Sequence, residues 1–125
     1  MKIVIVGDGK VGFTLAKQLD KEGHDVTIIE EKQRVLNSTM NLLDVVGIQG
    51  NGANYDIQKE ADVKEADILI AATSADELNI ICCILAKKIG ARSTIARIRN
   101  PEYIKSLSIL KDELRLSMHI NPEMA

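Results

Sequence analysis

A chain of 125 residues is long enough to bury one hydrophobic core and leaves no room for a second domain. Hydrophobic residues make up 46% of it and the net charge is −2, which indicates a packed globule and argues against electrostatic attraction to nucleic acid or membrane surfaces. Aromatic residues make up only 2%, which argues against a stacking platform for single-stranded nucleic acid.

Apolar strands alternate with amphipathic helices along the chain. The first half predicts a strand over 2–6, a helix over 11–22, a strand over 25–30, a helix over 32–43 and a strand over 44–50. The second half predicts a short helical link over 55–61, a strand over 67–73, a helix over 75–89, a strand over 93–98, a helix over 102–110 that starts at Pro101, and a strand over 115–120.

This alternation predicts an α/β fold, a Rossmann-like doubly wound parallel sheet of six strands with helices on both faces. The glycine-rich turn after the first strand favours the strand order 3-2-1-4-5-6. We expect residues 1–125 to be a single nucleotide-binding domain and part of a longer protein.

The chain carries no signal of secretion or membrane insertion. A strand is expected almost at the N-terminus, so we expect no signal peptide, and no apolar run has the length of a membrane span. Cys82 and Cys83 are neighbours in a helical pattern, which predicts small core residues in a reducing cytosol rather than a disulfide or a zinc site.

The first strand leads into "GDGKVG", in which Gly7, Gly9 and Gly12 have G-x-G-x-x-G spacing. The first glycine allows a tight turn, the second allows close approach of a phosphate, and the third allows the helix to pack on the strand. The N–H groups at the start of the helix that begins at Val11, with the positive end of its dipole, are therefore expected to face a phosphate. We expect the Asp8 carboxylate to point toward solvent or a neighbouring loop, because it would repel that phosphate.

Glu30 ends the second expected strand, where a carboxylate accepts hydrogen bonds from the ribose hydroxyls of an adenosine. It would repel a 2′-phosphate, so NADP is disfavoured. Glu31 is the competing acid, but the strand alternation ends at Glu30. Arg34 in the following helix either lies over the adenine or is an ordinary solvated base.

Three later positions are candidates for the same site. Asn51 is either an adenine or ribose contact or part of a plain turn. Thr73 and Ser74 follow the fourth strand beside the switch point, where their hydroxyl and N–H groups could reach a pyrophosphate or second ribose; alternatively Ser74 caps the next helix, with Glu77 completing a capping box.

Arg97 lies inside the fifth strand, where an unpaired charge is unfavourable. Its partner is either a phosphate or one of the acids Asp76 and Glu77, and Arg99 is the less favoured candidate for the phosphate.

Several residues look catalytic without forming a catalytic set. Tyr55 and Lys59 have Y-x-x-x-K spacing, but they fall on a short link, so we interpret the match as chance. His24 is expected on the far side of the sheet, His119 stands alone, and Asp44, Asp62, Asp67 and Asp112 are typical surface or boundary acids. No nucleophilic triad or metal-ligand spacing is present, so we expect no catalytic residues and no metal site.

The stretches "IVIVGDGKVGFTLAKQL", "HDVTIIE", "ADILIAATSADELNIICCILAKKIGA" and "IARIRNPEY" resemble the regulator-of-potassium-conductance domain, and more closely the N-terminal domain of TrkA-type potassium-uptake proteins. The resemblance covers essentially the whole chain. It implies a cytoplasmic regulatory subunit, peripheral at the inner face of the cell membrane, that binds NAD/NADH or ATP/ADP. It also implies a homodimer or higher ring under a TrkH-like potassium channel or transporter subunit, and a change of shape rather than hydride transfer.

Carried over by position, the ligand contacts would be residues 7–11, Glu30, Thr73, Ser74 and Arg97. Asn51 stands where many members have aspartate. Lys10 stands where arginine is common and would approach the outer phosphates, and Glu123 matches an acid that some members place near phosphates or a divalent ion. The rival interpretation from the residues is the cofactor-binding half of an NAD-dependent oxidoreductase.

Overall fold

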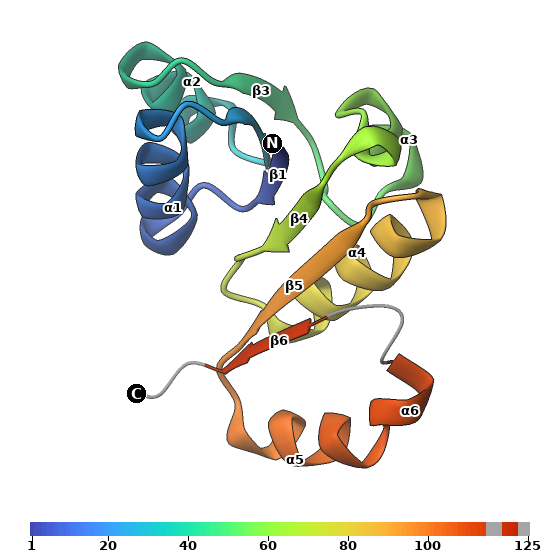
Figure 1. Ribbon diagram of the computed structural model, residues 1–125. Helices are drawn as coiled ribbons and strands as arrows, with labels where there is room; N and C mark the ends of the chain where they lie inside the picture. Colours follow the sequence, from blue (N-terminus) through green and yellow to red (C-terminus); the bar gives the residue numbers. More distant parts are fainter. Residues whose placement is uncertain (115–118, 123–125) are drawn as a thin grey trace.

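The computed structural model describes residues 1–114 and 119–122 of the chain (Figure 1). Its parallel strands have the order β3-β2-β1-β4-β5, as predicted, and β6 pairs with the outer edge of β5. The strands are β1 (Lys2–Val6), β2 (Asp25–Glu30), β3 (Val46–Gln49), β4 (Ile68–Ala71), β5 (Ser93–Ile98) and β6 (His119–Pro122).

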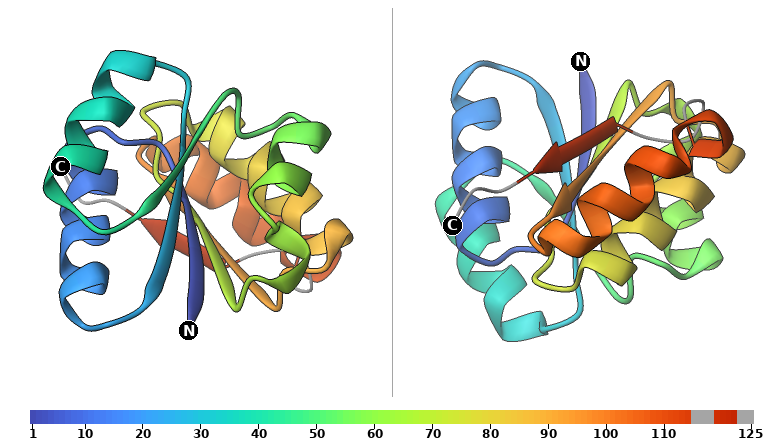
Figure 2. Two further views of the ribbon diagram at one scale, coloured as in Figure 1. Left: turned by 90° about the horizontal axis from the view of Figure 1, so that it is seen from above. Right: turned by 90° about the horizontal axis from the view of Figure 1, so that it is seen from below.

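The helices form a layer on each face of the sheet (Figure 2). They are α1 (Lys10–Lys21), α2 (Gln33–Leu42), α3 (Tyr55–Glu60), the 3-10 turn η1 (Val63–Glu65), α4 (Asp76–Ile89), α5 (Pro101–Ile109) and α6 (Lys111–Leu114). Helices α1 and α2 pack on one face of β1 and β2, while α3, η1, α4 and α5 pack on the other face. This change of face between the two halves follows from right-handed crossovers that run in opposite directions from β1 and β4.

The central strand β1 is apolar on both faces because both are covered. Ile3 and Ile5 pack against the α1 and α2 layer, whereas Val4 and Val6 pack against the α3 and α4 layer, and all four are at most 2% exposed. Such a continuous apolar run is typical of a buried parallel strand.

The element boundaries differ from the predicted ones by a few residues. Strand β3 begins only at Val46 and is partly exposed as an edge strand, and η1, which follows the left-handed residue Asp62 (φ 60°), was not predicted. The predicted last strand overlaps β6 at residues 119 and 120, and its first four residues lie outside the described ones. No helix among the described residues is long and apolar enough to cross a membrane.

Cys82 and Cys83 are fully buried in the core beneath α4, as predicted. Burial raises the pKa of each thiol to about 12, so both remain protonated and unreactive at neutral pH.

Candidate functional site

A cleft of about 850 Å³ lies at the carboxyl ends of the central strands, at the boundary between β1 and β4, where the direction in which successive strands are added to the sheet reverses. We call it the switch-point cleft. Open α/β sheets bind ligands in this position because the strand ends diverge there. Its walls come from the glycine loop (residues 7–12), the end of β2, the start of α2, the loop after β3 and the ends of β4 and β5.

The three glycines of the loop have different surroundings. Gly7 has φ +101°, and a Cβ there would lie 3.0 Å from the backbone nitrogen of Thr73. A Cβ on Gly12 would lie 1.8 Å from the carbonyl oxygen of Gly7, so α1 can pack this closely on β1 only through a glycine. A Cβ on Gly9 would meet nothing within 4 Å, so the space above the middle glycine is open to the cleft.

Helix α1 begins at Lys10 with Gly9 as its N-cap, and no side chain caps it. The first N–H groups of a helix lack acceptors within the helix and carry the positive end of its dipole. Lys10 and Val11 line the switch-point cleft beside them, so this end of the cleft is suited to an anion.

Glu30, at the end of β2, is held rigidly beside the glycine loop. One carboxylate oxygen accepts the backbone N–H of Asp8 at 2.9 Å, and the other accepts that of Lys32 at 2.8 Å. Each oxygen keeps a second lone pair for another donor. The carboxylate therefore faces the cleft in a set orientation, with acceptor capacity for a pair of hydroxyl groups.

Asp8 lies in the same loop, but its side chain is only 4% exposed. Neither carboxylate oxygen makes a well-formed hydrogen bond among the described residues, although the Thr39 hydroxyl lies close enough to act as a weak donor. Burial raises the pKa of Asp8, the nearby Thr39 hydroxyl of α2 partly opposes this, and the charge of Glu30 adds to it. Of the two directions expected for this carboxyl, solvent or a neighbouring loop, solvent is wrong, because Asp8 is buried.

The end of β4 is organised by Asn79 rather than by a cap at Ser74. Helix α4 starts at Asp76 with Ala75 as its N-cap, so the predicted capping box does not form, and Glu77 instead accepts the Tyr103 hydroxyl at 2.6 Å. The Thr73 N–H and hydroxyl both donate to Asn79 Oδ1, at 3.0 and 2.6 Å. These groups, predicted to reach a ligand, are therefore engaged within the protein.

Arg97 and Ser74 complete this end of the switch-point cleft. The Arg97 guanidinium donates to the Thr73 carbonyl oxygen at 3.3 Å. The acids weighed as its partners are engaged elsewhere, because Asp76 accepts the N–H groups of Arg99 and Asn100 at 2.9 and 2.8 Å. The half-buried guanidinium of Arg97 places a cationic group at this end of the cleft, which Ser74 also lines.

Two predicted contacts lie at the rim. Asn51 is exposed and its Oδ1 accepts the Ala53 N–H at 2.8 Å, which is the plain-turn alternative, and the neighbouring Gly50 and Gly52 line the cleft instead. Arg34 is not among the lining residues; Lys32 and Val35 are. Val35 lies in the first turn of α2, which begins at Gln33, and the amphipathic pattern of this helix could have indicated that it faces inward.

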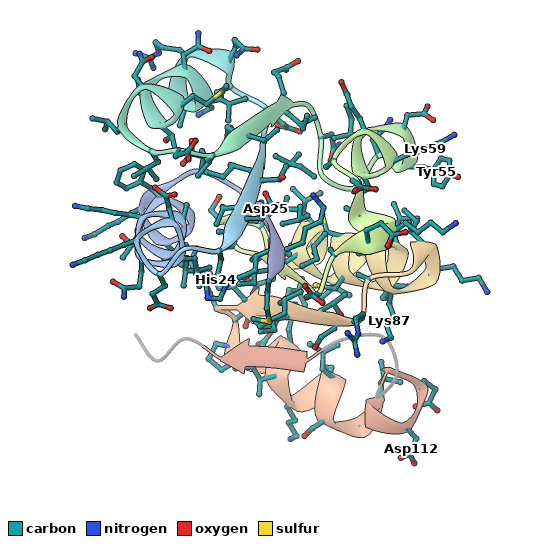
Figure 3. The ribbon with its side chains drawn as sticks, turned by 45° about the horizontal axis from the view of Figure 1, so that its top comes forward. His24, Asp25, Tyr55, Lys59, Lys87 and Asp112 are labelled. Carbon is teal, nitrogen blue, oxygen red and sulfur yellow. The ribbon has the colours of Figure 1, made fainter. Side chains whose placement is uncertain are left out.

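The residues that look catalytic, which Figure 3 labels, are not among those that line the switch-point cleft. Tyr55 and Lys59 are on α3, and His24 lies at the start of β2, where its Nδ1 is 3.1 Å from the N-terminal amine. The described residues contain no group of three or more potential metal ligands. Glu123, the candidate for an interface ion, lies outside the described residues.

The family model of the TrkA-N domain matches residues 3–115 of the chain. The Trk system potassium uptake protein TrkA homolog of Archaeoglobus fulgidus is 40% identical over 125 residues, which are all of this chain and 28% of that protein. The corresponding homolog of Methanothermobacter thermautotrophicus is 41% identical over 103 residues, 82% of this chain and 48% of that protein. The chain thus spans between about a quarter and a half of these relatives.

Solved structures share the fold at low identity. The TrkA-N domain of the inner membrane protein ybaL from Escherichia coli superposes with a TM-score of 0.83 at 19% identity, over 99% of this chain and 87% of that one. The GsuK channel bound to NAD gives 0.77 at 16% identity, over 95% and 21%. The Kef C-terminal domain of Shewanella denitrificans in its AMP-bound form gives 0.73 at 18% identity, over 97% and 72%.

Proposed function

The chain belongs to the TrkA-N domain family, and from that premise we propose that it is the nucleotide-sensing domain of a potassium-uptake regulator. Its ligand is an adenine nucleotide, either NAD/NADH or ATP/ADP, bound in the switch-point cleft. The observation that carries this proposal is the Glu30 carboxylate, which two backbone amides orient beside a glycine loop whose middle position is open.

The ligand is placed by matching its groups to the walls of the switch-point cleft. The ribose hydroxyls donate to Glu30, and the phosphates lie against the first turn of α1 with Lys10 beside them. Val35 offers an apolar surface for the adenine, and Gly50 and Gly52, which have no side chain, allow the adenine to lie close to the backbone. Groups beyond the first phosphate extend toward Ser74 and Arg97.

The domain acts by a population shift. A nucleotide that binds one geometry of a homodimer or ring more tightly than another favours that geometry, and only such differential affinity can do so. A TrkH-like membrane subunit at the inner face of the cell membrane then responds to the favoured geometry. One structural neighbour is a channel bound to NAD and another is a domain in its AMP-bound form, which supports an adenine nucleotide as the ligand class.

The alternative is the cofactor-binding half of an NAD-dependent oxidoreductase. Hydride transfer needs a general acid or base near the nicotinamide, most often a histidine or tyrosine. None of His24, Tyr55 and Tyr103 lines the switch-point cleft. We therefore favour binding without turnover.

Calorimetric titration with NAD, NADH, NADP, ATP, ADP and AMP tests the proposal. We expect NADP to bind at least about tenfold more weakly than NAD, because its 2′-phosphate would lie beside Glu30; tenfold corresponds to about 1.4 kcal/mol. The variant Glu30→Gln should narrow this difference. Equal NAD and NADP affinities would contradict the role of Glu30, and no binding of any of the six would contradict the proposal itself.

A further inference from the structure

Asn79 on α4 is fully buried and uses all of its hydrogen-bonding capacity at the end of the switch-point cleft. Its Oδ1 accepts the N–H and the hydroxyl of Thr73, at 3.0 and 2.6 Å. Its Nδ2 donates to the carbonyl oxygens of Thr73 and Arg97, at 3.0 and 2.8 Å. One side chain thus ties the ends of β4 and β5 to the first turns of α4.

We propose that Asn79 is a positioning residue that makes the switch-point cleft selective for nucleotides with a second phosphate or a second nucleoside. This inference rests on the proposed function. Asn79 does not touch the ligand; it sets the places of Ser74 and Arg97, which do.

The first step of the argument concerns Thr73. Its N–H and hydroxyl donate to Asn79, its hydroxyl oxygen accepts the Ala75 N–H at 3.2 Å, and its carbonyl accepts from Asn79 and Arg97. Every polar atom of Thr73 is engaged within the protein. Thr73 therefore has a structural role. The hydroxyl that can contact a ligand here is that of Ser74, which is exposed and lines the cleft.

The second step concerns Arg97. Asn79 holds its carbonyl oxygen, and the carbonyl of Thr73, itself held by Asn79, accepts a bond from its guanidinium at 3.3 Å. Asn79 thus positions the backbone of Arg97 directly and its side chain through the Thr73 carbonyl. A guanidinium fixed before binding loses little entropy when it meets a phosphate, which is how preorganisation increases affinity.

The third step concerns location. Asp76 lies three residues before Asn79 on the same side of α4 and accepts the N–H groups of Arg99 and Asn100. The start of α4 therefore binds the end of β5 both at Arg97, through Asn79, and at the two residues after the strand, through Asp76. These contacts all lie on the β4 and β5 side of the switch-point cleft, away from Glu30. A ligand with one phosphate on the glycine loop does not depend on them, whereas a longer ligand does.

Gln58 on α3 provides a matched control. It is also a fully buried side-chain amide, and its Nε2 donates to the carbonyl oxygens of Gly52 and Cys82, at 2.8 and 3.1 Å. It ties the loop after β3 to α4, on the adenine side of the cleft. Replacing it disturbs a buried amide of the same kind at the opposite end of the ligand.

The experiment is calorimetric titration of AMP and NAD into the wild type and the variants Asn79→Leu, Thr73→Val and Gln58→Met, each checked for folding by circular dichroism. For Asn79→Leu we expect NAD affinity to fall at least about tenfold and AMP affinity to change less than about threefold, as expected when a preorganised charged hydrogen bond is lost. Thr73→Val removes only the hydroxyl that bonds to Asn79 and keeps the shape of the side chain. It should also lower NAD affinity relative to AMP affinity. Gln58→Met should weaken AMP and NAD alike.

If Asn79→Leu does not fold, the ratio of NAD affinity to AMP affinity measured with Thr73→Val tests the positioning role. Equal losses of AMP and NAD in the folded Asn79 or Thr73 variant would overturn the positioning role while leaving the proposed function intact. Failure of the wild type to bind either nucleotide would instead overturn the proposed function.

Discussion

Asp8 and Glu30 are two carboxyl groups at one end of the switch-point cleft, and their surroundings give them different tasks. Glu30 keeps two backbone N–H donors, which stabilise its anion, whereas Asp8 is buried without a well-formed hydrogen bond among the described residues. A buried carboxylate without donors is costly, and protonation removes most of that cost. Glu30 is therefore the acceptor in the proposed nucleotide site, and we expect Asp8 to be a source of pH dependence.

The first prediction concerns Asp8→Asn. Because the pKa of Asp8 in the folded protein lies above its ordinary value of 3.8, its contribution to stability is full below that value and is lost as the pH rises through the folded-state pKa. We expect the neutral variant to be more stable than the wild type at pH 7, by about 1 kcal/mol, and the difference to shrink toward pH 4. Urea unfolding at both pH values measures this.

Asp44→Asn, which alters an exposed acid, is the control and should show no such trend. A wild type that is more stable than Asp8→Asn at pH 7 would show that the buried carboxyl has a donor in solution. Anionic ligands on the glycine loop should bind less tightly as Asp8 ionises, so nucleotide affinity should fall with rising pH in the wild type only.

At the scale of the elements, the glycine loop and α1 act as one unit. Gly12 brings the helix against the carbonyl of Gly7, while Gly9 leaves room where a ligand phosphate would lie. Gly12 is therefore needed for packing and Gly9 for ligand access, a difference that the G-x-G-x-x-G spacing alone does not reveal.

The second prediction separates these two roles. Gly12→Ala should lower the free energy of unfolding by about 2 kcal/mol or more, because the new Cβ would lie 1.8 Å from a backbone oxygen that cannot move without shifting the strand. Gly9→Ala should keep stability within about 1 kcal/mol, since its Cβ meets no protein atom, yet it should weaken nucleotide binding. Chemical denaturation and calorimetry on both variants measure this; tight binding by Gly9→Ala would place the phosphates elsewhere.

Element positions were largely predictable, and element ends less so. Strands β2 and β5 have the predicted bounds because their apolar runs stop at charged or turn residues, whereas the start of α4 was misplaced at residue 75. Ser74 and Glu77 match a capping box locally, but Tyr103 donates to the Glu77 carboxylate and Asn79 binds the neighbouring Thr73. Asn79 and Tyr103 reach these groups only because the tertiary fold brings them close, and spacing in the sequence does not reveal that.

For the whole molecule, the switch-point cleft joins the two halves of the sheet. The glycine loop and Glu30 belong to the half built on β1 to β3, and Ser74 and Arg97 belong to the half built on β4 and β5. A ligand that contacts both halves stabilises the entire fold, because unfolding either half destroys the site.

The third prediction follows from this placement. At a free NAD concentration of about 100 times its Kd, the folded state should gain about 2.7 kcal/mol, which raises the melting temperature by about 10 °C for a domain of this size. Scanning calorimetry measures the shift. Nicotinamide mononucleotide, which lacks the adenosine that Glu30 would hold, is the control and should shift it far less; an equal shift would contradict binding through the adenosine.

The sequence by itself determined the fold class, the strand order and the family, because each depends on local patterns: apolar runs that end in turns, a glycine loop between a strand and a helix, and several specific stretches. The tertiary structure alone decided how the candidate residues are used. It engaged the polar groups of Thr73 with Asn79, buried Asp8 and turned Asn51 onto its own loop. The physical reason is that a hydrogen bond depends on which groups meet in space, and residues such as Asn79 and Arg97, far apart along the chain, meet only when the sheet has formed.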